Sequence, residues 1–226
     1  MSVRSYDKKQ QGGLKLSENF TAGEFACGDG SDLILIDDKL VTILQRIRNW
    51  ANAPVRISSA YRTAEYNRAV GGASASYHIK GKAADIIVSG RTPAEVARFA
   101  EAAGVLGIGL YTAQKFVHVD TRTVKYCWRN SGKGNVTVST HGGKCPYKRP
   151  SVNVKPGSTG NNVRWVQWWL RMWGYDVAVD GSFGAETEAA VRNHQKRLDI
   201  AVDGIVGMKT KNGLVGDYRI IAPAEE

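Results

Sequence analysis

The chain has 226 residues, 42% of them hydrophobic and 23% charged, which is ordinary for a folded globular protein. Its formal net charge of +10 favours a polyanionic partner, such as nucleic acid, an anionic membrane or an acidic cell wall, without selecting one of them. No apolar run is long enough to cross a bilayer as a helix, so we expect no membrane insertion.

The beginning of the chain and its cysteines bear on where the protein is made. Residues 1–9 lack the apolar stretch of a secretory signal peptide, so we expect synthesis without one in a cytoplasm. The cysteines are odd in number and form no C-x-x-C pair; they are Cys27, Cys127 and Cys145. We expect reduced thiols, although Cys127 and Cys145 could pair in an oxidising compartment.

The first 130 residues predict an α+β domain with a small, mainly antiparallel sheet. Apolar residues at helical spacing from Leu40 to Trp50 predict a helix, with Asp37 or Asp38 as its N-cap. Thr92 and Pro93 begin another helix that Gly104 ends. The elements we expect are strands at 54–59, 83–88, 107–111 and 116–120, and helices at 40–50, 63–70 and 93–103.

The composition changes between Thr121 and Pro150, where Lys and Arg recur and acidic residues are absent. We interpret residues 131–151 as a basic linker, in which Asn135–Thr140 could form a hairpin. The linker separates a domain at 1–130 from a second domain at 152–226.

The second domain is predicted to be an all-α module of three helices. Apolar residues from Val163 to Trp173 share one helical face, and Gly174 ends that helix. The two later helices, at 186–198 and 209–215, each follow a D-G-x-[FV]-G turn, at Asp180–Gly184 and Asp203–Gly207. Glycine supplies positive φ at such turns, so we expect Asp180 and Asp203 to form turns rather than to bind a ligand.

Two motifs of the first domain carry metal-ligating residue types. The pattern S-x-H-x-x-G-x-A-x-D runs from Ser76 to Asp85, and H-x-D follows at His118. Three N or O ligands with a fourth position open are what catalytic zinc requires. Asp85 lies within an apolar strand, where an unpaired carboxylate would be costly to bury. We therefore predict that His78, Asp85 and His118 bind Zn²⁺.

The residues around this site suggest catalytic roles. Asp120 lies two residues after His118 and on the same strand face, within reach of a zinc-bound water. We predict that Asp120 is the general base, although it could instead orient a ligand. Arg62, which follows a predicted strand, could hold a carbonyl oxygen or stabilise an oxyanion. We expect Ser76 and Tyr111 to contact the substrate.

These motifs resemble those of the zinc D-Ala-D-Ala peptidases, which share the hedgehog-type fold and include D,D-carboxypeptidases, vancomycin-resistance dipeptidases and phage endolysins. The resemblance spans about residues 16–129 and includes the segments Leu16–Phe20 and Ser59–Thr63. It implies that the two histidines and Asp85 are the zinc ligands and that Arg62 is the substrate arginine.

One departure from the family pattern concerns the catalytic base. Many relatives carry an acidic residue three positions before the strand histidine, or a histidine two positions before it. This chain has Lys115 and Phe116 there, and neither can act as that base.

Residues 152–216 resemble the three-helix peptidoglycan-binding domain, on the two D-G-x-[FV]-G turns and on Gly174-Tyr175. The resemblance implies that the second domain binds the cell wall. Consecutive helical positions face different directions, so the tryptophans of the first helix should not all be buried. Exposed apolar patches often bind a partner, and we predict that Trp165, Trp168 and Trp169 contact the wall.

Together these features predict an endolysin-like peptidoglycan hydrolase, anchored by its second domain. It would cleave a peptide bond of the stem peptide or cross-bridge with zinc-activated water, and act as a monomer on the wall after release from the bacterium that makes it. The alternatives are a D-Ala-D-Ala carboxypeptidase or wall-remodelling enzyme of bacterial origin, and a non-catalytic wall-binding protein with a structural zinc. Nucleic-acid binding is suggested only by the net charge, and we do not expect it.

Overall fold

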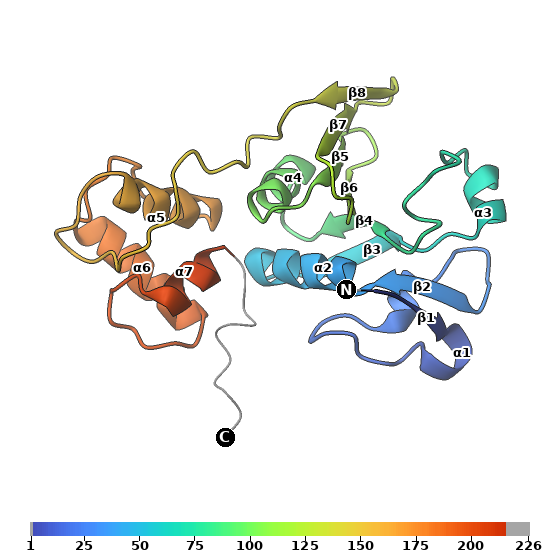
Figure 1. Ribbon diagram of the computed structural model, residues 1–226, viewed down its shortest axis with the longest axis horizontal. Helices are drawn as coiled ribbons and strands as arrows, with labels where there is room; N and C mark the ends of the chain where they lie inside the picture. Colours follow the sequence, from blue (N-terminus) through green and yellow to red (C-terminus); the bar gives the residue numbers. More distant parts are fainter. Residues whose placement is uncertain (1, 216–226) are drawn as a thin grey trace. The chain divides into compact units, whose positions relative to one another are not determined.

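The computed structural model describes residues 2–215 and divides the chain into two compact units (Figure 1). The first unit ends at Gly143 and the second begins at Lys144. Residues 131–143, expected to be linker, belong to the first unit because they add a strand to its sheet and bind its last helix. The end of the predicted second domain, residues 216–226, lies outside the described residues.

A six-stranded sheet forms the centre of the first unit. Its strand order is β3-β4-β6-β5-β7-β8. Neighbouring strands are antiparallel except β5 and β7, which are parallel. The strands are β3 (Val55–Ser59), β4 (Ala83–Val88), β5 (Gly107–Tyr111), β6 (Phe116–Asp120), β7 (Tyr126–Asn130) and β8 (Asn135–Val138). The predicted α+β class with a mainly antiparallel sheet is confirmed.

Helices α2 (Asp38–Ala51) and α4 (Pro93–Ala102) pack against this sheet and against each other. Trp50 of α2 stacks on Phe99 of α4 with ring centroids 4.5 Å apart. The caps match the sequence, since Asp37 accepts a hydrogen bond from the backbone N–H of Lys39, and Thr92 forms a capping box with its helix.

The first unit also contains a second, smaller sheet and several short helices. A separate two-stranded sheet pairs β1 (Val3–Asp7) with β2 (Leu33–Asp37). Short helices follow at α1 (Lys8–Gln11), η1 (Ala22–Phe25) and α3 (Ala64–Ala69). Cys27 and Cys127 are buried, and the three cysteines are free thiols in the described part of the chain.

The second unit contains α5 (Asn161–Met172), α6 (Ala185–Arg197) and α7 (Met208–Leu214), which confirms the three-helix module. Helix α5 contacts both of the others and buries Val163, Val166 and Leu170. None of the helices among residues 2–215 has the length and apolarity to span a bilayer.

The two D-G-x-[FV]-G turns are held by the same hydrogen-bond network. The Gln167 side chain donates to Asp180 Oδ1 at 2.8 Å and accepts from the Gly181 backbone N–H at 2.9 Å. Gln195 repeats this arrangement with Asp203 at 2.7 Å and Gly204 at 2.9 Å. The weak repeat seen in the sequence is therefore a repeat of structure, in which both aspartates form turns.

Candidate metal centre and its cleft

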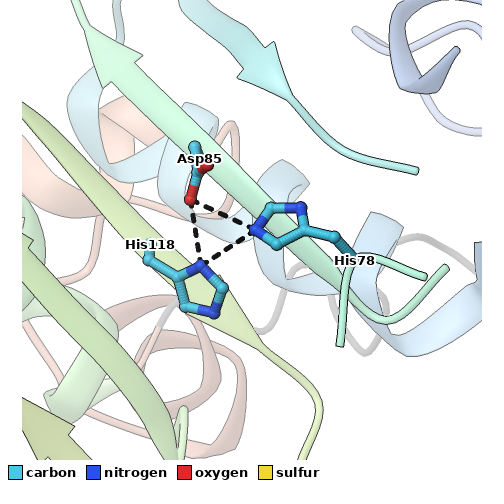
Figure 2. Close-up of side chains that lie close together, drawn as sticks. All are labelled: His78, Asp85 and His118. Carbon is cyan, nitrogen blue, oxygen red and sulfur yellow. Dashed lines mark hydrogen bonds and ion pairs between the residues drawn. The ribbon is translucent and has the colours of Figure 1, made fainter. Parts of the chain in front are cut away.

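Three predicted ligands converge from two strands and a loop (Figure 2). Asp85 on β4 and His118 on β6 are direct partners in the antiparallel register, so their side chains lie together on one face of the sheet. His78 reaches them from the loop that precedes β4. The three side chains are buried, and one potential ligand atom of each lies within 4.8 Å of the others.

The separations between these atoms fit a tetrahedral cation. His118 Nδ1 lies 2.9 Å from Asp85 Oδ1 and 3.1 Å from His78 Nε2, and His78 Nε2 lies 3.4 Å from Asp85 Oδ1. Tetrahedral ligands bonded at about 2.0–2.1 Å to zinc are about 3.3 Å apart. Two imidazoles and one carboxylate also form the donor set of a zinc site that leaves a position open.

Both imidazole rings are oriented by their other nitrogen. His78 Nδ1 lies 2.6 Å from the carbonyl oxygen of Ala60, which directs Nε2 towards the centre. His118 Nε2 lies 3.1 Å from Asp120 Oδ2, which leaves Nδ1 for the centre. Such partners fix the tautomer and direction of a metal-binding histidine.

The electrostatics of the cluster follow from burial and from these contacts. Burial lowers the pKa of His78. For His118 burial acts in the same direction, but the hydrogen bonds to Asp120 and Asp85 prevail and raise its pKa to about 9. Burial opposes ionisation of Asp85, yet hydrogen bonds from His118 and His78 hold its pKa well below the usual range. With its pKa raised, His118 carries a proton between Asp85 and Asp120, and a metal ion that binds here would displace that proton.

Asp120 lies behind His118 rather than in the open centre. Its side chain is fully buried and accepts hydrogen bonds from His118 and from both Nε and Nη2 of Arg122. The backbone N–H of Arg122 adds a further bond at 3.0 Å. With both oxygens engaged, Asp120 has the geometry of a residue that orients His118, which was the alternative to its predicted role as general base.

Two glycines of β5 make this arrangement possible. Gly107 faces Asp120 across the β5–β6 pair, and a Cβ at Gly107 would overlap the carboxylate. A Cβ at Gly109 would overlap the indole of Trp128. The ring centroids of Trp128 and His118 are 5.1 Å apart. The G-x-G spacing in β5 was the available sequence signal for these neighbours, and sequence reasoning missed it.

The centre opens into a cleft of about 580 Å³. The cleft brings together the predicted Arg62, Ser76 and Tyr111 with the three candidate ligands, but Asp120 does not line it. Arg62 donates from Nη2 to Asp85 Oδ2 at 2.8 Å and from Nε to Ser59 Oγ at 2.8 Å. The lining residues that the sequence did not single out include Tyr77, Arg122, Tyr126 and Trp128.

The tryptophans of α5 are less accessible than the sequence suggested. Trp165 and Trp169 are each only 3% exposed, so the prediction that they contact the wall is wrong. Helix α5 packs against two helices rather than one, which covers a wider arc of its surface. Trp168 is half-buried, and its contact with the wall stays a prediction.

Comparison with protein families agrees with this division of the chain. Residues 16–120 match the family model described as Peptidase M15, and residues 159–214 match the one described as Putative peptidoglycan binding domain. No solved structure gives a significant match.

Curated relatives are similar over part of this chain. Peptidoglycan L,D-endopeptidase MepK of Escherichia coli K12 is 32% identical over 98 residues, which are 40% of this chain and 54% of the relative. Zinc D-Ala-D-Ala carboxypeptidase of Streptomyces albus G is 40% identical over 67 residues, 27% of this chain and 26% of the relative. N-acetylmuramoyl-L-alanine amidase CwlL of Bacillus licheniformis is 37% identical over 86 residues, 36% and 24% respectively. The chain thus spans about half or less of the length of these relatives.

Proposed function

We propose that this chain, which joins a Peptidase M15 domain to a C-terminal peptidoglycan-binding domain, is a zinc-dependent peptidoglycan hydrolase. The observation that carries the proposal is the buried triad of His78, Asp85 and His118, whose ligand atoms are spaced for one tetrahedral ion at the base of a cleft. The bond cleaved is a peptide bond of the stem peptide or of the cross-bridge.

The residues present fit zinc, and the triad would hold it. When bound, zinc supplies a Lewis acid for a carbonyl oxygen and lowers the pKa of water. The protein contributes the orientation of the ligands, through the Ala60 carbonyl and the Asp120 carboxylate. Arg62 is held by Asp85 and Ser59 at the cleft wall, where its charge would stabilise negative charge developing on the substrate.

The second domain is proposed to hold the enzyme on its insoluble substrate. Tethering raises the local concentration of cleavable peptides without any new contact at the reaction centre. The net charge of +10 favours adsorption to an anionic wall. A polymer-binding domain in the same chain as an open cleft favours an endopeptidase over a dipeptidase that acts on small fragments.

We propose further that the enzyme is endolysin-like: a monomer made in the cytoplasm of a bacterium and active on the wall after release. These statements rest on the combination of a wall hydrolase domain and a wall-binding domain in one chain.

The test is mass spectrometry of muropeptides after digestion of purified peptidoglycan by the full chain. New stem-peptide or cross-bridge termini are expected, and they should be absent with His118→Ala and with chelated protein, then return when Zn²⁺ is added back to the latter. Zinc-loaded protein that binds peptidoglycan but leaves the muropeptides of several wall types unchanged would instead support a non-catalytic wall-binding protein.

A further inference from the structure

Arg122 occupies a position in the cleft that the triad does not explain. It lies two residues after the end of β6, and its guanidinium lies against three aromatic rings. The guanidinium carbon is 4.8 Å from the ring centroid of Tyr77, 5.1 Å from that of Tyr126 and 5.5 Å from that of Trp128. Tyr77 belongs to the loop that precedes β4, whereas Tyr126 and Trp128 belong to β7. Two separate segments of the fold therefore converge on this one cation.

One edge of the guanidinium is fixed and the other is not. Nε and Nη2 both bond to the buried Asp120 carboxylate. Nη1 makes no hydrogen bond within residues 2–215, and the Arg122 side chain keeps 17% of its surface exposed. The hydrogen bonds to Asp120 explain the positions of Nε and Nη2. They do not explain why Arg122 also lines the cleft with Nη1 left unbonded.

The open edge is organised to bind an anion. Arginine presents planar N–H donors that match a carboxylate, and a guanidinium stacked on rings loses little freedom when it binds. Tyr77, Tyr126 and Trp128 therefore hold Nη1 in place before any ligand arrives. Among the described residues that line the cleft, Asp85 is the only carboxylate, and it is already bonded to Arg62.

We propose that Nη1 of Arg122 binds a carboxylate of the peptide substrate and so selects substrates that carry this group. The inference rests on the proposed function and adds a specificity residue to it. Arg62 and Arg122 occupy different parts of the centre, because Arg62 is bonded to Asp85 whereas Arg122 is bonded to Asp120, behind His118. The substrate would thus be held by a guanidinium on either side of the triad.

The experiment compares synthetic stem peptides in which each carboxylate is replaced in turn by a carboxamide. For the zinc-loaded wild type, one such replacement should lower kcat/KM about tenfold to a hundredfold, as expected for the loss of one charge-assisted hydrogen bond. The Arg122→Gln variant should cleave the carboxylate peptide and its carboxamide analogue about equally. Its loss of activity on the carboxylate peptide should be mainly a rise in KM.

Two further variants serve as control and as second test. Arg129→Gln removes the same charge from an exposed position of β7 outside the cleft and should retain the wild-type discrimination. Tyr126→Leu alters one ring of the cage at a residue that is 42% exposed, so folding is preserved, and should weaken the discrimination partly. Zinc content is measured for every variant.

The ratio of kcat/KM between the carboxylate and the carboxamide peptide shows whether Arg122 recognises the substrate or only holds Asp120. If wild type and Arg122→Gln discriminate equally, or if no carboxamide affects the wild type, Arg122 serves only to hold Asp120. Calorimetric binding of the same peptides makes the readout independent of turnover. Discrimination in binding without cleavage would uphold the role of Arg122 and overturn the hydrolase proposal.

Discussion

The polar side chains buried in the two units of this molecule differ in what satisfies them. In the second unit, Gln167 and Gln195 each bridge a turn, and their amides are fully engaged with Asp180 or Asp203 and with backbone groups. In the first unit, ligand atoms of His78, Asp85 and His118 face one point. A cluster whose donors and acceptors bond to one another stabilises a fold. A cluster whose acceptor atoms converge on one point is suited to bind a cation.

Replacing a convergent ligand should have the largest effect. His118→Ala is expected to abolish zinc binding and to reduce peptide hydrolysis to the level of chelated protein, since two donors alone hold zinc weakly. Metal analysis and a muropeptide assay measure both outcomes. Retention of stoichiometric zinc by this variant would contradict the assigned ligand set.

Zinc itself should distinguish the two clusters. A ligand at a thousand times its dissociation constant stabilises a folded protein by about 4 kcal/mol. Hydrogen exchange of the full chain should therefore slow in peptides that contain β4 and β6 when Zn²⁺ is added. Peptides that contain Gln167 and Gln195 serve as the internal control, and equal protection of both regions would remove the contrast drawn between the clusters.

The role of Asp120 gives the next effect in size. Asp120→Asn should weaken zinc binding about tenfold to a hundredfold, as for other partners of metal-binding histidines, and excess zinc should restore most of the activity. A competition assay with a metallochromic chelator measures the affinity. Full zinc occupancy with activity still lost would instead identify Asp120 as the general base.

The paired glutamines test the structural cluster. Gln195→Leu leaves the Gly204 N–H and the Asp203 carboxylate without their partner and should destabilise the second unit by about 1–3 kcal/mol. Gln167→Leu should behave alike because its network is the same. Denaturant unfolding measures the loss, while hydrolysis of soluble peptides should be unaffected; a loss of that activity would show that the second unit takes part in the chemistry.

The smallest expected effect concerns acid stability of the first unit. Glu101 accepts hydrogen bonds from Lys125, Thr140 and the backbone of Gly143. Burial opposes its charge, but these bonds, Lys125 first, lower its pKa to about 2. A carboxyl whose folded pKa is depressed stabilises the fold above its unfolded pKa of 4.5, and loses this contribution as pH falls towards 2.

Melting curves across that range check the contribution of Glu101. Glu101→Gln should flatten the fall in melting temperature between pH 4.5 and 2, the two pKa values of this carboxyl. An unchanged pH profile would show that other carboxyls govern acid unfolding.

The sequence predicts those parts of the site that come from one short motif or from two strands paired side by side. His78 and Asp85 lie in one short motif, and the pairing of β4 with β6 brings His118 beside Asp85. Trp128 and Tyr126 could not be placed in this way, because they reach the cleft only through the parallel pairing of β5 with β7. That pairing joins segments without a hairpin between them, and nothing local in the sequence indicates it.

The wrong expectation about the tryptophans has a similar cause. A helical pattern shows which residues share a face, but not how many faces are covered. Helix α5 packs against both α6 and α7, and both Trp165 and Trp169 are buried, which a single apolar stripe does not predict. Arg122 was missed for a related reason, since its aromatic neighbours come from elements that only the fold brings together.

The most direct test of the account is the position of zinc in a crystal of the metal-loaded protein, located by anomalous scattering at the zinc edge. We predict one ion bonded to His78 Nε2, Asp85 and His118 Nδ1, with His118 Nε2 still hydrogen-bonded to Asp120. Zinc bound through His118 Nε2 together with Asp120, or no zinc at the triad, would contradict it.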